Sequence, residues 1–362
     1  SGILPRGAIQ LIMGGTGNLL DILDCQDTVG FTGSAATALA LRARPNILKN
    51  GVRFTAEQDS LNGSILGSDV APGSAEFDLF VTEVHREMTT KAGQKCTAIR
   101  RIMVPEAHME AVQTALKARL RATKIGHPAL ADTQMGALVS LDQRLDVRAQ
   151  AQLLGKECDL VFGGEDRCQV EGADAETGAF LAPMLFVCAD PDHAVAVHEV
   201  EAFGPVATLM PYRDIVHGIE LLNRGDGSLV ASVITHDPAI ARQVVLGAGA
   251  FHGRLYFNDR VSQAESTGHG SPLPHMVHGG PGRAGGSEEL GGLRGVKHYM
   301  QRSAVQGSPD MLTAITGTWI KGSTELTAPA HPFTRNFDQL QIGETLHTAG
   351  REVTLKDIEY FA

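Results

Sequence analysis

The sequence has little of what disulfide-rich domains, membrane proteins and nucleic-acid-binding proteins depend on. Its 362 residues include five cysteines and one tryptophan, and 5% of the residues are aromatic. An odd number of widely spaced cysteines without a CxxC pair argues against a disulfide framework and favours reduced thiols in the cytoplasm. Basic residues number 31 against 41 acidic ones, a net charge of −10, which argues against a nucleic-acid partner.

Long apolar runs are also missing. The most apolar segment near the start, residues 8–13, is much shorter than the ~20 residues of a membrane-spanning helix, and it lacks the basic flank and cleavage site of a signal peptide. We therefore expect no membrane partner. The content of 43% hydrophobic and 20% charged residues, with 41 glycines, suits a globular α/β chain of two or three domains.

Strand-like and helix-like stretches alternate along most of the chain. Residues 8–13, 29–34 and 52–57 are short apolar runs typical of strands, and a helical pattern covers residues 35–44 until Pro45 stops it. Because similar alternation continues as far as Asn258, the sequence predicts a parallel, doubly wound sheet.

Two later segments have distinct patterns. A helix with one buried face is predicted to end near Ala92 and Gly93, because apolar residues recur at spacings of three and four: Phe77, Phe80, Val81, Val84 and Met88. Residues 268–295 contain ten glycines and three prolines, which predicts an ordered loop or a lid. The histidines of this segment (His269, His275 and His278) lack the cysteine or carboxylate that would complete a metal site, so none is predicted.

Cys96 follows directly on the predicted end of that helix, in Gly93-Gln94-Lys95-Cys96-Thr97. Neighbouring backbone N–H groups and Lys95 are surroundings that favour a thiolate and so a nucleophile, whereas a buried structural thiol is the commoner role of a cysteine. Glu57 ends a strand-like run earlier in the chain. A carboxylate near a thiol can activate water to cleave a thioester, although most such carboxylates are simply solvated.

Two glycine turns follow predicted strands. The turn at residues 14–17 is as consistent with a plain tight turn as with a phosphate site. In Phe31-Thr32-Gly33-Ser34, the serine can cap the next helix, and the same helix N-terminus can bind a pyrophosphate; the two roles are compatible.

These motifs occur together with Glu201-Ala202-Phe203-Gly204-Pro205-Val206, in the order and approximate spacing of the aldehyde dehydrogenase superfamily, which the sequence resembles. The resemblance implies a Rossmann-like α/β fold with its N-terminal part missing. It also implies Cys96 as the nucleophile and Glu57 as the base. Cofactor-binding roles follow for five residues: Thr32, Gly33 and Ser34 at the pyrophosphate, and Glu201 and Phe203 at the nicotinamide ribose and ring.

One subgroup of the superfamily matches more closely. Residues 57–62, Glu-Gln-Asp-Ser-Leu-Asn, replace the common Glu-Leu-Gly-Gly-Lys, and residues 279–286 are glycine-rich. With the tail from Arg335, these features resemble the bifunctional ring-opening enzymes of bacterial phenylacetate degradation, in which an aldehyde dehydrogenase is fused to a MaoC-like hot-dog hydratase. By this resemblance, an oxyanion-binding Asn and the adenine-ribose contacts would precede Ser1, and the hydratase Asp and His would follow Ala362.

The resemblance also implies a division of the chain. Residues 1–55 would be the remainder of an NAD(P)-binding domain, and residues 56–250 the catalytic domain. Residues 251–322 would return to the cofactor domain and include a glycine-rich oligomerisation segment. Residues 323–334 would be a linker, and residues 335–362 the start of an α+β hot-dog domain.

The implied reaction is oxidation of a CoA-linked semialdehyde, of the 3-oxo-5,6-dehydrosuberyl-CoA semialdehyde type, to the carboxylate through a cysteine thiohemiacetal and thioester. The cofactor would be NADP rather than NAD, the assembly a homo-oligomer, and the fused hydratase would open oxepin-CoA to supply the aldehyde. Two alternatives stay open. One is a CoA-acylating or general aldehyde dehydrogenase, and the other is a non-catalytic scaffold that binds nucleotide or CoA.

Overall fold

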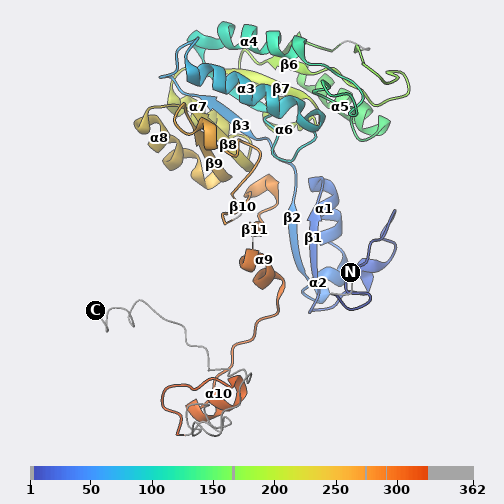
Figure 1. The fold of residues 1–362 in the computed structure, drawn as a ribbon, viewed down its shortest axis with the longest axis vertical. Coiled ribbons are helices and arrows are strands. Elements are labelled where there is room, and N and C mark those ends of the chain that lie inside the picture. The colour runs from blue at the N-terminus through green and yellow to red at the C-terminus, as the bar shows by residue number, and fades with distance from the viewer. Residues whose placement is uncertain (1–3, 165–167, 274, 291, 325–362) are drawn as a thin grey trace, which may run out of the picture. The chain divides into compact units, whose positions relative to one another are not determined.

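The computed structural model describes residues 4–164, 168–273, 275–290 and 292–324. The chain divides into two compact units, Ser1–Tyr299 and Met300–Ala362. Within its described residues, the first unit contains a seven-stranded sheet and two two-stranded sheets (Figure 1). Each sheet brings a different part of the sequence to the candidate site.

The first two-stranded sheet is formed by β1 (Thr28–Thr32) and β2 (Arg53–Glu57), which are parallel and in register from one end to the other. The connection between them carries α1 (Ala35–Arg42) and α2 (Pro45–Lys49). The two predicted strands are confirmed. The predicted helix ends slightly earlier than expected, and its proline, besides ending one helix, begins the next, because proline fits the first turn of a helix.

The strand predicted at residues 8–13 is wrong. These residues form no regular element, and their apolar side chains are exposed, Ile9 to 77%. A strand needs a neighbour for its backbone N–H and C=O groups, and within the described residues β1 pairs with β2 alone. Beyond the following glycine turn, the expected helix is reduced to one 3₁₀ turn, Leu19–Asp21.

The seven-stranded sheet has the strand order β5-β6-β7-β4-β3-β8-β9. All neighbouring strands are parallel except β5 and β6, which are antiparallel at the edge. The parallel sheet predicted from the alternation is therefore confirmed. The strands are β3 (Gly63–Leu66), β4 (Arg101–Pro105), β5 (Asp159–Phe162), β6 (Met184–Val187), β7 (Val206–Tyr212), β8 (Ser228–Ile234) and β9 (His252–Asn258).

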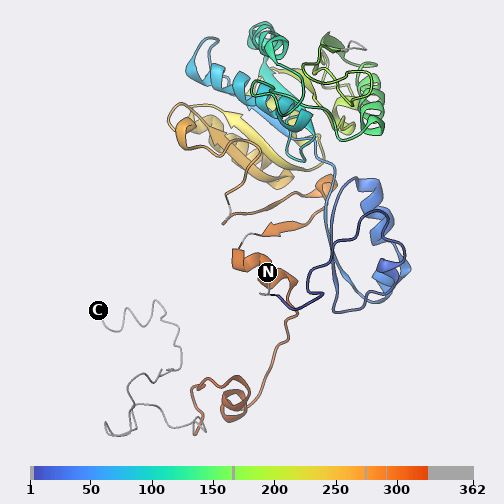
Figure 2. The same ribbon diagram turned by 45° about the vertical axis from the view of Figure 1, so that its right-hand side comes forward.

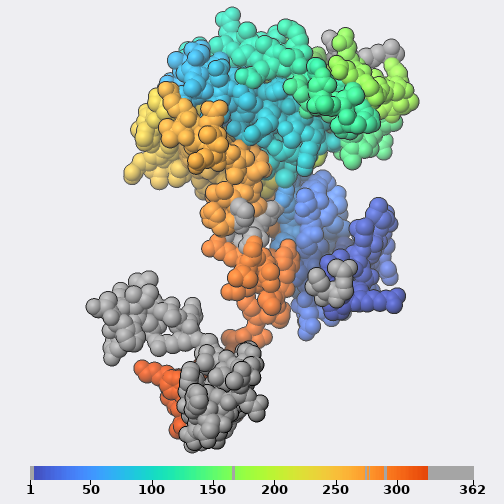
Figure 3. All heavy atoms as spheres, in the orientation of Figure 1, coloured from blue at the N-terminus to red at the C-terminus, as the bar shows by residue number. Residues whose placement is uncertain are grey.

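Helices cover both faces of this sheet, as Figures 1 and 2 show. Figure 3 shows the view of Figure 1 with all heavy atoms as spheres. Helices α3 and α4 pack on one face, and α5, α7 and α8 on the other. The helices are α3 (Ala75–Thr89), α4 (Met109–Ala122), α5 (Leu141–Leu154), the short α6 (Ala196–Glu199), α7 (Ile215–Asn223) and α8 (Pro238–Ala248).

The two hydrophobic cores follow from the alternation of side chains along each strand. In β4, Met103 belongs to the core under α5, α7 and α8, whereas Ile102 and Val104 belong to the core under α3 and α4. Ile65 and Leu66 of β3 divide in the same way. Each such buried side chain contributes about 1.5–3 kcal/mol, so the two cores fix the register of the strands.

The glycine-rich segment is more regular than a loop. It contains the antiparallel pair β10 (Val277–Gly279) and β11 (Glu288–Leu290), followed by α9 (Gly292–Tyr299). The predicted domain boundary after residue 250 falls before β9, although β9 is part of the seven-stranded sheet. The five-domain division stays a prediction.

In the second unit, the described residues form α10 (Pro309–Thr316), which Ser308 caps and Gly317 ends in a left-handed conformation. The predicted hot-dog segment, residues 335–362, and most of the predicted linker lie outside the described residues. None of the helices in the described part of the chain has the length and apolarity that crossing a bilayer requires.

Candidate active site

The segment that carries Cys96 leaves α3 through a sharp reversal. A 3₁₀ turn follows α3, and three successive residues have left-handed backbones: Lys91 (φ 53°), Ala92 (φ 52°) and Gly93 (φ 68°). For the two that are not glycine, this conformation costs about 1 kcal/mol or more each. Cys96 then lies, half-buried, in a turn closed by a hydrogen bond from Ala98 N to Lys95 O of 3.1 Å. Contacts with other parts of the chain must therefore offset the backbone strain at Lys91 and Ala92.

Gly93 makes one of those contacts, with the backbone of Gly204. A Cβ at this position would overlap the carbonyl of Gly204, and a Cβ on Gly204 would lie 2.7 Å from Cγ1 of Val147 in α5. There is therefore no room for a methyl group at either glycine. The segment that carries Cys96 packs on the Phe203-Gly204 segment, which in turn packs on α5.

Replacing Gly93 with alanine is expected to lower the free energy of unfolding by more than about 2 kcal/mol, because it adds left-handed strain to a backbone clash. Gly136→Ala is the matched control, since no atom lies within 4 Å of its added Cβ, and a change within about 0.5 kcal/mol is expected there. Urea denaturation of the two variants checks this. Equal stabilities would show that Gly93 and Gly204 do not approach closely.

Asn62, in the segment that follows Glu57, is hydrogen-bonded to the segment that carries Cys96. Its side-chain Nδ2 donates to the carbonyl oxygens of Cys96 (2.8 Å) and Ala98 (3.0 Å). Its Oδ1 accepts from Val230 N (3.1 Å) and from the hydroxyl of Ser60 (2.6 Å). Because Asn62 and Ser60 are buried, these bonds fix the backbone of Cys96 relative to β8 and to the end of β2.

Glu57 is the last residue of β2 and pairs in register with Thr32 of β1. Gly33 N donates to the Glu57 carbonyl oxygen at 3.1 Å. The carboxylate Oε1 is buried and has no hydrogen-bond partner among the described residues. It is therefore an acceptor available to a water molecule or a ligand.

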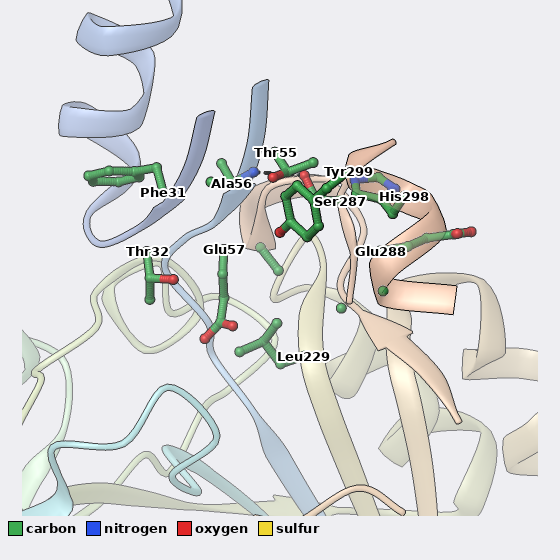
Figure 4. A pocket seen from close by; sticks show the side chains of 14 residues that line it. Phe31, Thr32, Thr55, Ala56, Glu57, Leu229, Ser287, Glu288, His298 and Tyr299 are labelled. Atoms are coloured by element: carbon green, nitrogen blue, oxygen red, sulfur yellow. Dashed lines mark hydrogen bonds between the residues drawn. The ribbon is translucent and has the colours of Figure 1, made fainter. Parts of the chain in front are cut away.

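Glu57 and Thr32 line a cavity of about 460 Å³. In Figure 4 the Glu57 carboxylate lies near Thr32 and Leu229, and Thr55, Ser287, His298 and Tyr299 line the other end. Two hydrogen bonds fix the far wall: Ala56 N donates to Ser287 Oγ (2.8 Å), and Arg53 Nη1 donates to the His298 carbonyl (2.7 Å).

The start of α1 is already hydrogen-bonded. The Ser34 hydroxyl accepts from Thr37 N at 3.2 Å, which confirms the predicted cap, and Ala35 N donates to Asp59 Oδ1 at 3.0 Å. Neither Gly33 nor Ser34 lines the cavity. A pyrophosphate at this helix N-terminus would therefore meet Asp59, one of the residues that distinguish this sequence from the common family pattern.

Glu201 lies between Ser60, in the residue 57–62 segment, and Arg100. Its Oε2 accepts from Ser60 N at 3.1 Å, and its Oε1 lies 3.7 Å from Arg100 Nε. Burial raises the pKa of Glu201 to about 7, although the Arg100 guanidinium acts in the opposite direction. Oε1 has no hydrogen-bond partner in the described structure, so it is suited to accept a hydrogen bond from a ribose hydroxyl.

Arg100 connects the predicted site residues. Its Nη1 donates to Gly204 O (2.6 Å), its Nη2 donates to Gly93 O (2.8 Å), and its guanidinium lies 5.4 Å from the centre of the Phe203 ring. Burial lowers the pKa of Arg100, whereas Glu201 and the Cys96 thiol act to raise it. Arg100 is therefore a cation that interacts with the Cys96 thiol.

The structure assigns Lys95 a different partner from the one expected. Its Nζ bonds to both oxygens of Glu87, at 2.8 and 2.7 Å, so its charge is shared with a buried carboxylate. Burial raises the pKa of Glu87, and Lys95 acts in the opposite direction. In the described part of the chain, no group of three or more His, Cys, Asp or Glu residues is arranged to hold a metal ion.

The structure thus brings the predicted residues together in two groups. Thr32, Gly33 and Glu57 meet at the ends of β1 and β2. The second group, Cys96, Glu201 and Phe203, surrounds Arg100. The link between the groups is the segment with Ser60 and Asn62. Sequence reasoning missed Arg100, Ser60, Asn62 and Asp59; the signal for the arginine was a charge inside the apolar run of residues 99–104.

Comparison with protein families identifies a match over residues 2–305, to the family described as the aldehyde dehydrogenase family. A 3,4-dehydroadipyl-CoA semialdehyde dehydrogenase of Aromatoleum evansii is 44% identical over 281 residues, which cover 78% of this chain and 55% of that protein. Protein MaoC of Klebsiella aerogenes is 51% identical over 230 residues, which cover 63% and 67%. This chain thus spans about half the length of the first of these relatives.

Among solved structures, betaine aldehyde dehydrogenase from Staphylococcus aureus in complex with NAD+ matches with a TM-score of 0.65 and 26% identity, over 75% of this chain and 50% of that one. HpcC from Thermus thermophilus matches with a TM-score of 0.64 and 25% identity, over 75% and 48%. The α/β architecture with a Rossmann-like part is therefore confirmed.

Proposed function

The chain belongs to the aldehyde dehydrogenase family, and from this premise we propose that it supplies the nucleophile and the general base for oxidation of an aldehyde to a carboxylate. The observation that carries the proposal is the convergence of three distant segments, residues 57–62, 93–100 and 201–204, through Asn62 and Arg100. A scaffold without chemistry would not require a strained turn and a buried arginine next to the Cys96 segment, or a buried Glu57 oxygen without a hydrogen-bond partner among the described residues in the neighbouring cavity.

Cys96 has the first role in the proposed mechanism. Its thiolate adds to the aldehyde carbon and forms a thiohemiacetal, whose negative oxygen drives loss of the carbon-bound hydrogen as hydride. A nicotinamide dinucleotide, when bound, supplies the hydride acceptor. Arg100 favours the charged thiolate, and the hydrogen bonds of Asn62 hold the peptide of Cys96 in place.

Glu57 has the second role. Its carboxylate takes a proton from water, and the hydroxide adds to the thioester carbon; the carbon–sulfur bond then breaks, which releases the carboxylic acid and restores the Cys96 thiolate. The buried Oε1 of Glu57 supports this role because it lines the cavity and lacks a hydrogen-bond partner among the described residues.

The residues present fit a dinucleotide in two respects. Glu201 Oε1 is a buried acceptor that lies 3.7 Å from Arg100 Nε and has no hydrogen-bond partner among the described residues, so a ribose hydroxyl could donate to it. Thr32 and Phe31 line the cavity beside Glu57. We assign Glu201 and Phe203 to the nicotinamide ribose and ring, and Thr32, Gly33 and Ser34 to the pyrophosphate. We propose NADP rather than NAD on the strength of the subgroup resemblance alone.

We further propose a CoA-linked semialdehyde as the substrate, of the 3-oxo-5,6-dehydrosuberyl-CoA semialdehyde type. The name of the Aromatoleum relative, a 3,4-dehydroadipyl-CoA semialdehyde dehydrogenase, supports a CoA-linked semialdehyde as the substrate class. The suberyl type rests on the subgroup resemblance, and the name of the Klebsiella relative, MaoC, supports the hydratase part of the proposal. In the same proposal, a fused MaoC-like hydratase opens oxepin-CoA and supplies the aldehyde, as part of phenylacetate catabolism. The protein would act in the cytoplasm as a homo-oligomer, so that a reactive aldehyde passes directly between neighbouring sites.

The product distinguishes this proposal from a CoA-acylating dehydrogenase. When the protein oxidises the semialdehyde in the presence of excess free CoA, we expect the free carboxylate to account for nearly all of the reduced nicotinamide, because water activated by Glu57 cleaves the thioester. Liquid chromatography with mass spectrometry measures the two products. A new thioester at the terminal carbon would establish the acylating reaction instead, and no reduction at all would support a binding scaffold.

A further inference from the structure

Two thiols outside the candidate site face each other at the edge of the seven-stranded sheet. Cys158 comes directly before β5, and Cys188 directly after β6. Because these strands are antiparallel and Asp159 pairs with Val187, the two cysteines take the next opposing positions. Each thiol shifts the pKa of the other, which reflects how close the two groups lie. Both belong to the same hydrophobic core, with exposures of 6% and 0%.

This arrangement is close to the geometry of a disulfide. Opposing Cβ atoms in an antiparallel pair lie about 4.5–5.5 Å apart, and a disulfide needs about 3.5–4.5 Å. A small approach of two adjacent strand ends would therefore suffice. β5 is the edge strand, and its residues Asp159 and Leu160 are exposed. Because β5 is hydrogen-bonded to β6 alone within this sheet, a small shift of β5 disturbs one strand pair rather than two.

A cavity reaches the same place. It has a volume of about 380 Å³ and is lined by Leu160 and Phe186, which oppose each other one pair further along the β5–β6 ladder. Since side chains alternate along a strand, Leu160 lies on the same face as Cys158, and Phe186 on the same face as Cys188. Gly155, three residues before Cys158, lines the cavity as well. Neither cysteine lines the cavity, but the cavity borders the face of the β5–β6 ladder to which both sulfurs belong.

We propose that Cys158 and Cys188 form a peroxide-sensitive pair that closes into a disulfide across β5 and β6. The modification site is distinct from the candidate active site and does not depend on the proposed function. Hydrogen peroxide is the oxidant that this geometry favours, because it is small and uncharged and the sulfurs are buried.

The reaction begins at Cys188. The interaction between the two thiols lowers the pKa of Cys188 and raises the pKa of Cys158. The Cys188 thiolate attacks one oxygen of the peroxide, the O–O bond breaks, and the departing hydroxide takes up a proton to become water. The Cys158 sulfur then attacks the resulting sulfenic acid; the S–O bond breaks, and hydroxide leaves with the Cys158 proton as a second water. Two electrons pass from the two sulfurs to one peroxide.

The test uses the intact protein exposed to hydrogen peroxide, then quenched with catalase, unfolded, alkylated and digested. We expect one linked peptide pair that contains Cys158 and Cys188, a mass about 2 Da lower for that pair because two hydrogens leave, and reversal by dithiothreitol. The melting temperature should be higher for the oxidised form, since the bond constrains the unfolded chain.

Variants identify the partners. Cys168→Ser, a change of a half-buried thiol that the proposal does not involve, is expected to keep the linkage, whereas Cys158→Ser should lose it and leave Cys188 trappable by dimedone as a sulfenic acid. If Cys158→Ser fails to fold, peptide mapping of the unaltered protein still decides. Two results would overturn the proposal. One is that Cys158 and Cys188 are still fully alkylated when peroxide has already oxidised Cys96 or the exposed Cys25. The other is a disulfide between other cysteines.

Discussion

Replacing Cys96 with alanine is expected to abolish nicotinamide reduction, with a loss of at least about a thousandfold in kcat/KM, because no covalent intermediate can form. The measurement is the initial rate of absorbance change at the reduced nicotinamide band, over a series of semialdehyde concentrations that extends well below KM. Cofactor binding, followed by quenching of protein fluorescence, should change little, since Cys96 does not line the cavity that contains Glu57. The two readouts together separate loss of chemistry from loss of the fold.

The matched control is Cys168→Ala, which removes a half-buried thiol from a different part of the chain. Its rate should equal that of the unaltered protein. If Cys96→Ala retained a rate comparable to this control, the thiol would be structural, and the protein would belong with the binding scaffolds. If both variants lost activity together with their melting transitions, the loss would reflect unfolding, and Cys96→Ser would replace Cys96→Ala in the comparison.

The regular elements were predictable where one periodicity dominates a segment. The apolar face of α3 follows from side-chain spacing, because burial of that face is the largest favourable term in its folding. The strands β1 and β2 follow from their apolar character, although most of their side chains are only half-buried. Residues 8–13 have the same apolar character and form no strand. A strand exists only where a neighbour accepts its hydrogen bonds, and a local pattern holds no information about that neighbour.

In the candidate site, Cys96 and Glu57 could be selected from the sequence, and the residues that hold them could not. Cys96 and Glu57 stand in recognisable motifs, whereas Arg100 and Arg101 are adjacent arginines in one strand-like run, and nothing local tells which way each points. In the structure Arg100 bonds to Gly93 and Gly204, and Arg101 donates to the carbonyls of Leu221 and Leu222 at the end of α7. These partners are distant in sequence, so only the tertiary fold defines them.

Left-handed backbone at Lys91 and Ala92 was equally hidden from the sequence. Neither residue favours that conformation, and the glycine that follows is the only local hint of a reversal. The strained conformation is stabilised because Gly93 packs against Gly204. Asn62 and Arg100 also donate buried hydrogen bonds to the same segment. The packing around Cys96 thus stabilises the strained turn that precedes it.

Replacing Glu57 with glutamine is expected to separate the two halves of the reaction. Glutamine has nearly the same shape as glutamate but cannot take a proton from water, so hydride transfer proceeds once and the thioester persists on Cys96. Stopped-flow absorbance should show a burst of one reduced nicotinamide per active site. The steady-state rate that follows should be lower by about a hundredfold or more.

The control for this variant is Glu199→Gln, which neutralises an exposed carboxylate close to Glu201 in sequence. It should give linear progress curves at the rate of the unaltered protein, which shows that the burst is not a general effect of removing negative charge. Mass spectrometry of the quenched Glu57→Gln protein should find the acyl group on the peptide that contains Cys96. Linear curves at an unaltered rate for Glu57→Gln would assign the base to another group. Turnover that free CoA restores would mean that the acyl group normally leaves on a thiol rather than on water, and the enzyme would then be an acylating dehydrogenase.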